Sequence, residues 1–180
     1  MGRFYAMDRK KAWDRTKLSY EALVLGKSEF EAEDALSAVS SAYNRGESDE
    51  YIKPTVIKKD GKPVGSIKKD DAIVFFNLRS DRARQLTKVF GQEDFEEKNP
   101  DAFERKDFPE NTIFVALTDF GPDLENIFTA YPGIDVAESL PYALKAYRQL
   151  YVAETEKYAH ITYFFNGGYD HPIAGEVRIN

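Results

Sequence analysis

The strongest constraint on the fold is a short apolar run that leads directly into an arginine-rich turn. Residues 72–76 (Ala-Ile-Val-Phe-Phe) are rich in β-branched and aromatic side chains, which predicts a buried strand covered on both faces. The residues that follow predict a helix that is capped by Ser80 or Asp81 and closed by Gly91. Its apolar stripe consists of Ala83, Leu86, Val89 and Phe90. A strand followed at once by a helix indicates the α/β class, with a sheet and flanking helices.

Three arginines lie at the junction between this strand and this helix: Arg79, Arg82 and Arg84. The first turn of a helix is the positive end of its dipole, where a cation is disfavoured by roughly 0.3 to 1 kcal/mol. A bound anion offsets that cost, and the carboxyl ends of strands in α/β sheets are where ligands usually bind. We therefore interpret the junction as a phosphate or carboxylate site.

A second cationic junction lies at the start of the chain. Residues 3–7 predict a short strand, and Asp8 is placed to cap a helix that Gly26 ends. The first turn of that helix carries Arg9, Lys10 and Lys11. Two junctions with their own arginines favour one shared ligand with two charged ends. The alternative is that these arginines pair with some of the 31 acidic residues of the chain.

The rest of the chain reads as further alternating elements. Residues 28–31 have the pattern of a capping box, followed by a helix that ends at residues 44–46. Asp60-Gly61 predicts a hairpin turn. The apolar stripe of the capping-box helix consists of Ala32, Leu36, Val39 and Tyr43. The remaining predictions are an exposed charged segment at 91–111, a strand at 112–118, a helix at 136–147, a strand at 150–153, and a helix or strand at 158–165 that ends at 166–168. Gly121-Pro122 and Pro132-Gly133 indicate a crossing between domains.

Composition excludes several classes of protein. The chain has 180 residues, a formal net charge of -6 and no cysteine. It therefore lacks the overall positive charge of a protein that binds nucleic acid or an anionic membrane. It also has no disulfide framework and no cysteine nucleophile. The sequence contains neither an apolar stretch long enough to span a bilayer nor the hydrophobic region of a signal peptide. We expect a cytoplasmic protein with no nucleic-acid and no membrane partner.

Three segments resemble one family, the cofactor-independent (2,3-bisphosphoglycerate-independent) phosphoglycerate mutases. They are GRFYAMDR at residues 2–9, FFNLRSDRAR at 75–84 and AETEKYAHITYFFNGG at 153–168. The family usually has Asn-Phe-Arg-Pro-Asp-Arg in the second segment, whereas Leu78 and Ser80 replace the phenylalanine and proline here. Both arginines of that motif are present.

The resemblance implies a domain arrangement and an activity. Residues 1–131 correspond to the later part of a transferase, substrate-binding domain, and residues 132–180 to a hinge and the start of a returning phosphatase-like domain. The parent enzyme would be a monomeric isomerase of glycolysis that interconverts 3-phosphoglycerate and 2-phosphoglycerate through a phosphoserine. It would use two Mn²⁺ or Mg²⁺ ions and no 2,3-bisphosphoglycerate. The serine and the metal ligands would lie outside this chain, so that we expect no metal ligands here and no activity from the chain alone.

The resemblance also implies roles for five residues. Arg3 and Arg9 correspond to one arginine pair of the substrate pocket, and Arg79 and Arg82 to the other. Lys157 corresponds to a catalytic lysine that reaches the phosphoryl group from the phosphatase side. A guanidinium fork suits phosphate and carboxylate, and a compact ammonium suits a phosphoryl group in transfer.

Other residues and another function remain as alternatives. We interpret His160 as structural, Asp81 as a cap or a partner of Arg82, and Trp13 as core, and we assign no role to His171. Glu154 and Glu156 form an acid-base pair or cap the helix that follows them. The alternative function is a non-catalytic anion-binding module that carries the same arginine pocket.

Overall fold

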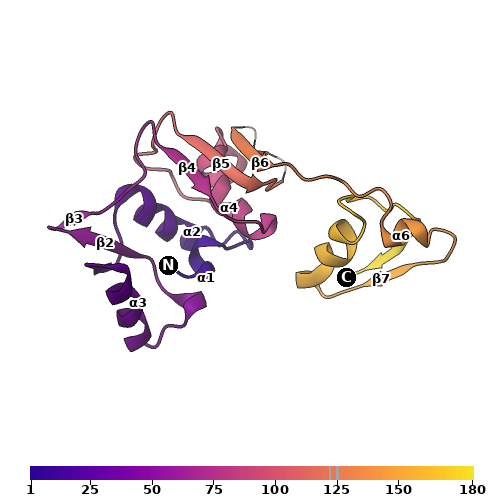
Figure 1. Cartoon of the computed structure of the whole chain (residues 1–180), viewed down its shortest axis with the longest axis horizontal. Helices are drawn as coiled ribbons and strands as arrows, with labels where there is room; N and C mark the ends of the chain where they lie inside the picture. Colours follow the sequence, from indigo (N-terminus) through magenta and orange to yellow (C-terminus); the bar gives the residue numbers. More distant parts are fainter. Residues whose placement is uncertain (122, 125) are drawn as a thin grey trace. The chain divides into compact units, whose positions relative to one another are not determined.

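The chain divides into two units, Met1–Pro132 and Gly133–Asn180, and each is described by itself. The computed structural model describes residues 1–121, 123–124 and 126–180. Pro122, one half of the predicted Gly-Pro turn signal, lies outside the described residues. The predicted α/β class is confirmed, because both units combine small sheets with helices (Figure 1).

The first unit contains a sheet with parallel strands and a smaller mixed sheet. Its helices are α1 (Arg3–Ala6), α2 (Trp13–Tyr20), the π-helical turn η1 (Glu21–Leu25), α3 (Ala35–Asn44), the 3₁₀ turn η2 (Asp49–Tyr51), α4 (Ser80–Gly91) and α5 (Phe95–Lys98). Its strands are β1 (Phe30–Ala32), β2 (Thr55–Lys59), β3 (Lys62–Pro63), β4 (Ala72–Phe75), β5 (Ile113–Thr118) and β6 (Ile127–Tyr131). The described strands form two sheets, in the orders β1-β2-β3 and β4-β5-β6.

The predicted strand β4 forms, but its expected burial on both faces is wrong. β4 pairs in parallel with β5, with Val74 opposite Val115, and β5 pairs in parallel with β6. One face of this sheet carries Ile73, Phe75 and Phe114 into the core. The opposite face remains open, with Val74 61% and Phe76 87% exposed. The reason is that, among the described elements, β4 is an edge strand and helices pack against only one face of the sheet.

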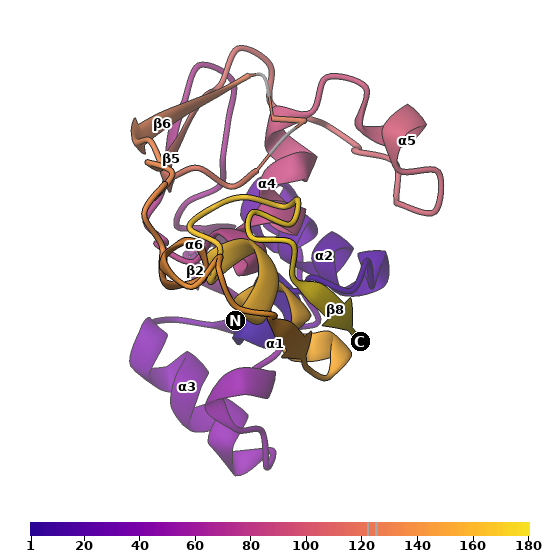
Figure 2. The same ribbon diagram turned by 90° about the vertical axis from the view of Figure 1, so that its right-hand side faces the viewer.

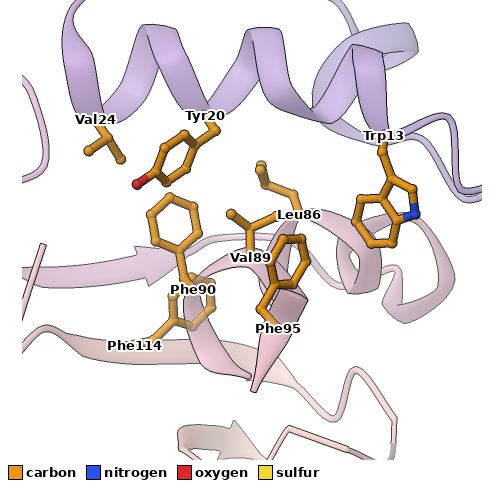
Figure 3. Packing of buried hydrophobic residues seen from close by; sticks show 8 residues of the cluster. All are labelled: Trp13, Tyr20, Val24, Leu86, Val89, Phe90, Phe95 and Phe114. Carbon is orange, nitrogen blue, oxygen red and sulfur yellow. The ribbon is translucent and has the colours of Figure 1, made fainter. Parts of the chain in front are cut away.

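Helix α4 is buried between helix α2 and the sheet. Its predicted stripe is confirmed, because Ala83, Leu86, Val89 and Phe90 are all buried. Figure 3 shows Tyr20 and Val24 descending from the α2 side toward Phe90, with Phe114 on the opposite side. Trp13 belongs to the same cluster, as predicted, and meets the Phe95 ring edge-on at 5.4 Å.

The charged segment at 91–111 was predicted to be exposed, and this is wrong for its aromatic residues. Phe95 in α5 is completely buried, and Phe103 and Phe108 pack on the same core. Arg105 ties the segment to α4, because its Nη1 donates to the carbonyls of Val89 and Gln92 at 3.2 and 2.9 Å. The segment is therefore mostly charged in sequence, but its aromatic residues form part of the core.

Three predictions for the first half of the chain are wrong. Residues 3–6 form helix α1 instead of a strand, and α2 begins at Trp13 rather than after Asp8. Ser28 caps no helix, because its hydroxyl donates to the Pro54 carbonyl while Phe30 pairs with Thr55 in the β1-β2 ladder. The helix begins later, at Ala35.

The predicted apolar stripe of this helix is also wrong. Asp34 caps α3 by accepting a 2.7 Å bond from the Ser37 N–H. Leu36 is 78% exposed, whereas Ala38 and Ala42 are buried. Figures 1 and 2 both show α3 at the periphery of the first unit, away from the β4-β5-β6 sheet. The small alanine face allows α3 to lie against β1 and β2, and the larger side chains are left outside.

The hairpin prediction is confirmed. Lys58 pairs with Pro63 and Lys59 with Lys62 in an antiparallel ladder between β2 and β3. Asp60 and Gly61 both have positive φ, of 52° and 73°, as a two-residue type I′ turn requires.

The second unit is built around a two-stranded parallel sheet. Its elements are α6 (Leu140–Ala143), β7 (Leu150–Val152), the 3₁₀ turn η3 (Thr155–Lys157), the π-helical turn η4 (His160–Phe164) and β8 (Val177–Ile179). The predicted strand at 150–153 is confirmed, and the ambiguous segment at 158–165 is helical and ends as predicted, with Gly167 and Gly168 at positive φ. The predicted helix at 136–147 is reduced to one turn, because the Val136 N–H donates to the Gly167 carbonyl and the chain before α6 is extended.

Replacement of Phe95 tests the hidden core segment. We expect Phe95→Ala to lower the free energy of unfolding by about 3 to 5 kcal/mol, because a buried aromatic ring is lost and leaves a cavity. The matched control is Phe76→Ala, which removes an exposed ring and should change stability by less than about 0.5 kcal/mol. Urea denaturation followed by circular dichroism measures both. Equal effects of the two variants would contradict the placement of α5.

Candidate functional site

The N-terminal segment is held against the turn at residues 49–52. The Gly2 N–H donates to the Ile52 carbonyl at 2.6 Å. A Cβ atom at Gly2 would lie 2.2 Å from the Glu50 carbonyl oxygen, so only glycine allows this close approach. The next residue, Arg3, therefore lies beside Glu50, and its Nη2 donates to Oε2 at 3.0 Å. This hydrogen bond lowers the pKa of Glu50.

A buried aspartate shapes the loop that presents Arg9. Asp8 is 5% exposed, and its Oδ2 accepts hydrogen bonds from the N–H groups of Lys10 and Ala12 at 3.0 and 2.9 Å. Asp8 therefore caps the turn before α2 rather than the helix itself. Gln85 of α4 fixes the same loop from the other side, because its Oε1 accepts from the Lys11 N–H at 2.9 Å.

Asp81 joins the two cationic junctions. Its Oδ1 accepts from Arg79 Nε at 2.8 Å, and its Oδ2 accepts from Arg9 Nη1. Burial raises the pKa of Asp81, but the hydrogen bonds from Arg79 and Arg9 outweigh burial and hold that pKa below its ordinary value. Asp81 is therefore ionised at neutral pH. The expectation that it caps α4 or orients Arg82 is wrong: α4 has Arg79 as its N-cap residue, without a side-chain cap.

Arg82 lies near both the N-terminal segment and Glu50. Its Nη1 reaches the Met7 carbonyl at 3.5 Å, and its charge contributes to the lowered pKa of Glu50. Its Nε is buried without a hydrogen-bond partner among the described residues. A buried guanidinium N–H is costly to leave unpaired, so its position favours an additional acceptor.

The structure thus brings the four predicted arginines into one region of the first unit. Arg9 and Arg79 share Asp81, while Arg3 and Arg82 adjoin Glu50. Asp81 and Glu50 are carboxylates that these guanidinium groups contact. We name these four arginines, with Glu50 and Asp81, the arginine cluster. The alternative of acidic pairing is realised in part, because Arg3, Arg9 and Arg79 each have a carboxylate partner.

A small pocket of about 100 Å³ adjoins the arginine cluster. Its lining includes Arg9, Asp81, Arg84 and Lys88. Arg84 joins α4 to the loop after β5, because its Nη1 donates to the Phe120 carbonyl at 2.9 Å and its Nη2 pairs with Asp123 at 3.2 Å. Arg84 therefore has a positioning role at the carboxyl edge of the sheet, separate from that of the other arginines.

Lys157 belongs to the second unit and lies at the end of η3. It is exposed, and its Nζ donates to Glu154 Oε1 at 2.8 Å. The prediction that Glu154 caps the following helix is wrong, because it makes no side-chain cap there. His160 lies against the Phe164 ring at 5.8 Å, and His171 lies against Tyr169.

A buried polar network lies at the end of the η4 turn. Asn166 accepts from Tyr151 of β7 at 3.1 Å and donates to Glu176 at 2.8 Å. Arg178 of β8 also donates to Glu176 at 2.8 Å. Burial raises the pKa of Glu176, but the bonds from Asn166 and Arg178 prevail and lower it to about 2. The network fixes the end of the η4 segment to both strands of the unit.

Within the part of the chain that the structure describes, no three His, Cys, Asp or Glu side chains gather closely enough to hold a metal ion. No described helix combines the length and the apolar character needed to span a bilayer.

Sequence reasoning missed several residues that build the site. Glu50, Gln85 and the link from Arg9 to Asp81 depend on contacts between segments far apart in the chain; Arg9 and Asp81 are 72 positions apart. No local pattern marks such partners. One weak signal for Glu50 was present in the sequence: Gly2 precedes Arg3, and glycine permits another backbone segment to approach closely.

Clustered arginines at the carboxyl end of a parallel strand in an α/β unit are typical of proteins that bind phosphate or carboxylate. A protein-family model described as "BPG-independent PGAM N-terminus" matches residues 1–122. The chain belongs to the 2,3-bisphosphoglycerate-independent phosphoglycerate mutase family, as its resemblance predicted.

Similar proteins agree with this assignment. The 2,3-bisphosphoglycerate-independent phosphoglycerate mutase of Clostridioides difficile is 47% identical over 180 residues, which cover 99% of this chain and 34% of that protein. The corresponding mutase 1 of Methanosarcina acetivorans is also 47% identical, over 98% of this chain and 34% of that protein. The chain spans about a third of the length of these curated relatives.

A solved structure also matches the fold. The crystal structure of Leishmania mexicana phosphoglycerate mutase at low cobalt concentration aligns with a TM-score of 0.76 and 26% identity. The alignment covers 99% of this chain and 33% of the Leishmania chain.

The buried Glu176 predicts a pH dependence for the second unit. A folded-state pKa of about 2, below the ordinary 4.5, contributes about 3 kcal/mol of stability above pH 4.5, and this is lost as the pH falls toward 2. Glu176→Gln should make the unit less stable at neutral pH and remove this acid dependence. The control is Glu138→Gln, at an exposed position. Amide hydrogen exchange of residues 150–152 in the whole chain reports the stability. Parallel pH profiles of Glu176→Gln and the unaltered chain would contradict the assignment.

Proposed function

We propose that this chain is the glycerate- and phosphate-holding part of a phosphoglycerate mutase that interconverts 3-phosphoglycerate and 2-phosphoglycerate through a phosphoserine. The observation that carries this proposal is the arginine cluster, which brings four guanidinium groups together and in which Arg82 Nε is buried without a hydrogen-bond partner among the described residues. Phosphoglycerate has an anionic group at each end. Family membership supplies the reaction class.

The four arginines would hold the substrate from two segments of the chain. Arg79 and Arg82 come from the turn after β4 and the first turn of α4, and Arg3 and Arg9 come from the N-terminal segment. Forked guanidinium groups from two sides suit a molecule that carries a carboxylate and a phosphate. The exposure of Arg3 and Arg79 also suits a grip that must release and turn the glycerate.

The first unit would then be the later part of the transferase domain, and residues 132–180 the hinge and the return into the phosphatase-like domain. The serine and the ligands for two Mn²⁺ or Mg²⁺ ions would lie in parts of the enzyme beyond this chain. When bound, those ions would supply charge stabilisation at the transferring phosphoryl group. We assign this chain no metal-binding residue and no use of 2,3-bisphosphoglycerate.

Lys157 would be the catalytic cation of the second unit. Its ammonium is exposed and pairs only at the surface, with Glu154, and such a pair is weak enough to exchange for a phosphoryl oxygen. The Glu176 network would hold the end of the η4 segment, which follows Lys157 in the chain, against both strands of the unit.

Removal of two arginines tests the pocket. Arg79→Ala/Arg82→Ala should weaken binding of 3-phosphoglycerate to this chain at least about 100-fold, because two charge-assisted contacts are lost at about 1.5 kcal/mol or more each. NMR titration measures the affinity. The control, Arg45→Ala/Lys69→Ala, removes two cations that pair with Glu47 and Glu110 instead. If the double variant titrates like the unaltered chain, the pocket is misplaced.

Replacement of Lys157 separates the mutase from the non-catalytic anion-binding module. In a complete mutase that carries this chain, Lys157→Ala should lower kcat about 100-fold or more, as expected for loss of one preorganised electrostatic group. The melting temperature and glycerate binding should stay nearly constant. Lys145→Ala provides the matched control, because Lys145 lies over Tyr142 in the same unit. Normal kcat in the Lys157 variant would favour the binding module.

A further inference from the structure

Asp81 occupies a position in the arginine cluster that the proposed function does not use. It lies in the first turn of α4 and accepts hydrogen bonds from two arginines that come from different segments. Arg79 reaches it through Nε at 2.8 Å and, more weakly, through Nη2 at 3.5 Å. Both carboxylate oxygens are therefore engaged by the cluster itself.

This geometry leaves part of the Arg79 guanidinium for a ligand. Among the described residues, Arg79 Nη1 has no hydrogen-bond partner, and the side chain is 48% exposed. Asp81 is only 27% exposed and belongs to a helix whose apolar face is buried, so its carboxylate is the fixed member of the group. The short, anchored Asp81 side chain therefore orients the long, flexible side chain of Arg79.

We propose that Asp81 is a positioning residue for the substrate: its carboxylate holds the Arg79 guanidinium beside Arg9 so that the outward Nη1 of Arg79 faces one anionic group of the phosphoglycerate. This inference rests on the proposed function of the arginine cluster. Asp81 touches neither the ligand nor the reacting atoms, and it acts only through the two arginines.

Two opposing effects decide the consequence of losing this carboxylate. Its negative charge repels an anionic ligand, but a partly exposed charge is strongly screened by water. Without it, the long Arg79 side chain regains rotamer freedom that the ligand must remove again on binding. Because ordering this side chain costs more than the screened repulsion, Asp81 strengthens anion binding.

The test uses Asp81→Asn in the whole chain, with inorganic phosphate and 3-phosphoglycerate as probes. An amide has the shape of the carboxylate but cannot accept from both arginines with both of its polar atoms. We expect about 10-fold weaker binding of both probes. The control is Asp123→Asn, which breaks the exposed ion pair of Arg84 on the same helix and should leave both affinities unchanged.

A direct readout separates positioning from general stabilisation. The Nε–H signal of Arg79 should exchange faster with water in Asp81→Asn, while the Arg105 signal and the melting temperature remain as they were. In a complete mutase, KM for 3-phosphoglycerate should rise about 10-fold, with kcat changed less than about 3-fold.

The outcomes distinguish this inference from the proposed function. Unchanged or tighter binding in Asp81→Asn, while Arg79→Ala/Arg82→Ala still abolishes binding, would overturn the positioning role alone. Unchanged binding in both variants would overturn the arginine pocket itself. Weaker binding with an equal slowing of kcat and a lowered melting temperature would show a structural role and would also overturn the inference.

Discussion

The burial of helix α4 is the constraint on which the candidate site depends. Leu86, Val89 and Phe90 pack between the α2 side and the parallel sheet, and Gln85 bonds to both Thr16 and the loop before α2. These contacts leave α4 little freedom to slide or rotate, since interiors pack as densely as organic crystals. The first turn of α4 is thereby fixed beside the N-terminal segment, and arginines from two distant parts of the chain meet.

The charges of the arginine cluster indicate binding more than stability. Exposed ion pairs such as Arg3–Glu50 contribute little to folding, because water screens the attraction between the two charges. The cluster instead gathers four guanidinium groups in one region of a chain whose net charge is -6. The two carboxylates limit repulsion among the arginines when no ligand is bound.

The second unit relies on polar contacts to a greater degree. Leu150, Val152 and Val177 of its two strands are each at least 60% exposed, and Tyr151 is its main buried aromatic residue. The fully satisfied Asn166–Glu176–Arg178 network takes over part of the role that an apolar core has in the first unit. A buried carboxylate with two strong donors specifies one arrangement of the strands and the η4 turn, since any other arrangement would leave its charge unpaired.

The sequence by itself determined the local elements that carry strong patterns, and the family. The strand at 72–75, the stripe of α4 and the Asp60-Gly61 hairpin follow from short-range chemistry. The motif residues Arg3, Arg9, Arg79 and Arg82 follow from the resemblance to the family. Tertiary structure decided which partners these residues meet: Asp81 bridges Arg79 and Arg9, Phe95 is buried within a charged segment, and Ser28 bonds to a strand instead of capping a helix. The physical reason is that propensity and capping act over a few residues, whereas burial and ion pairing depend on which distant segments the packing of α4 brings into contact.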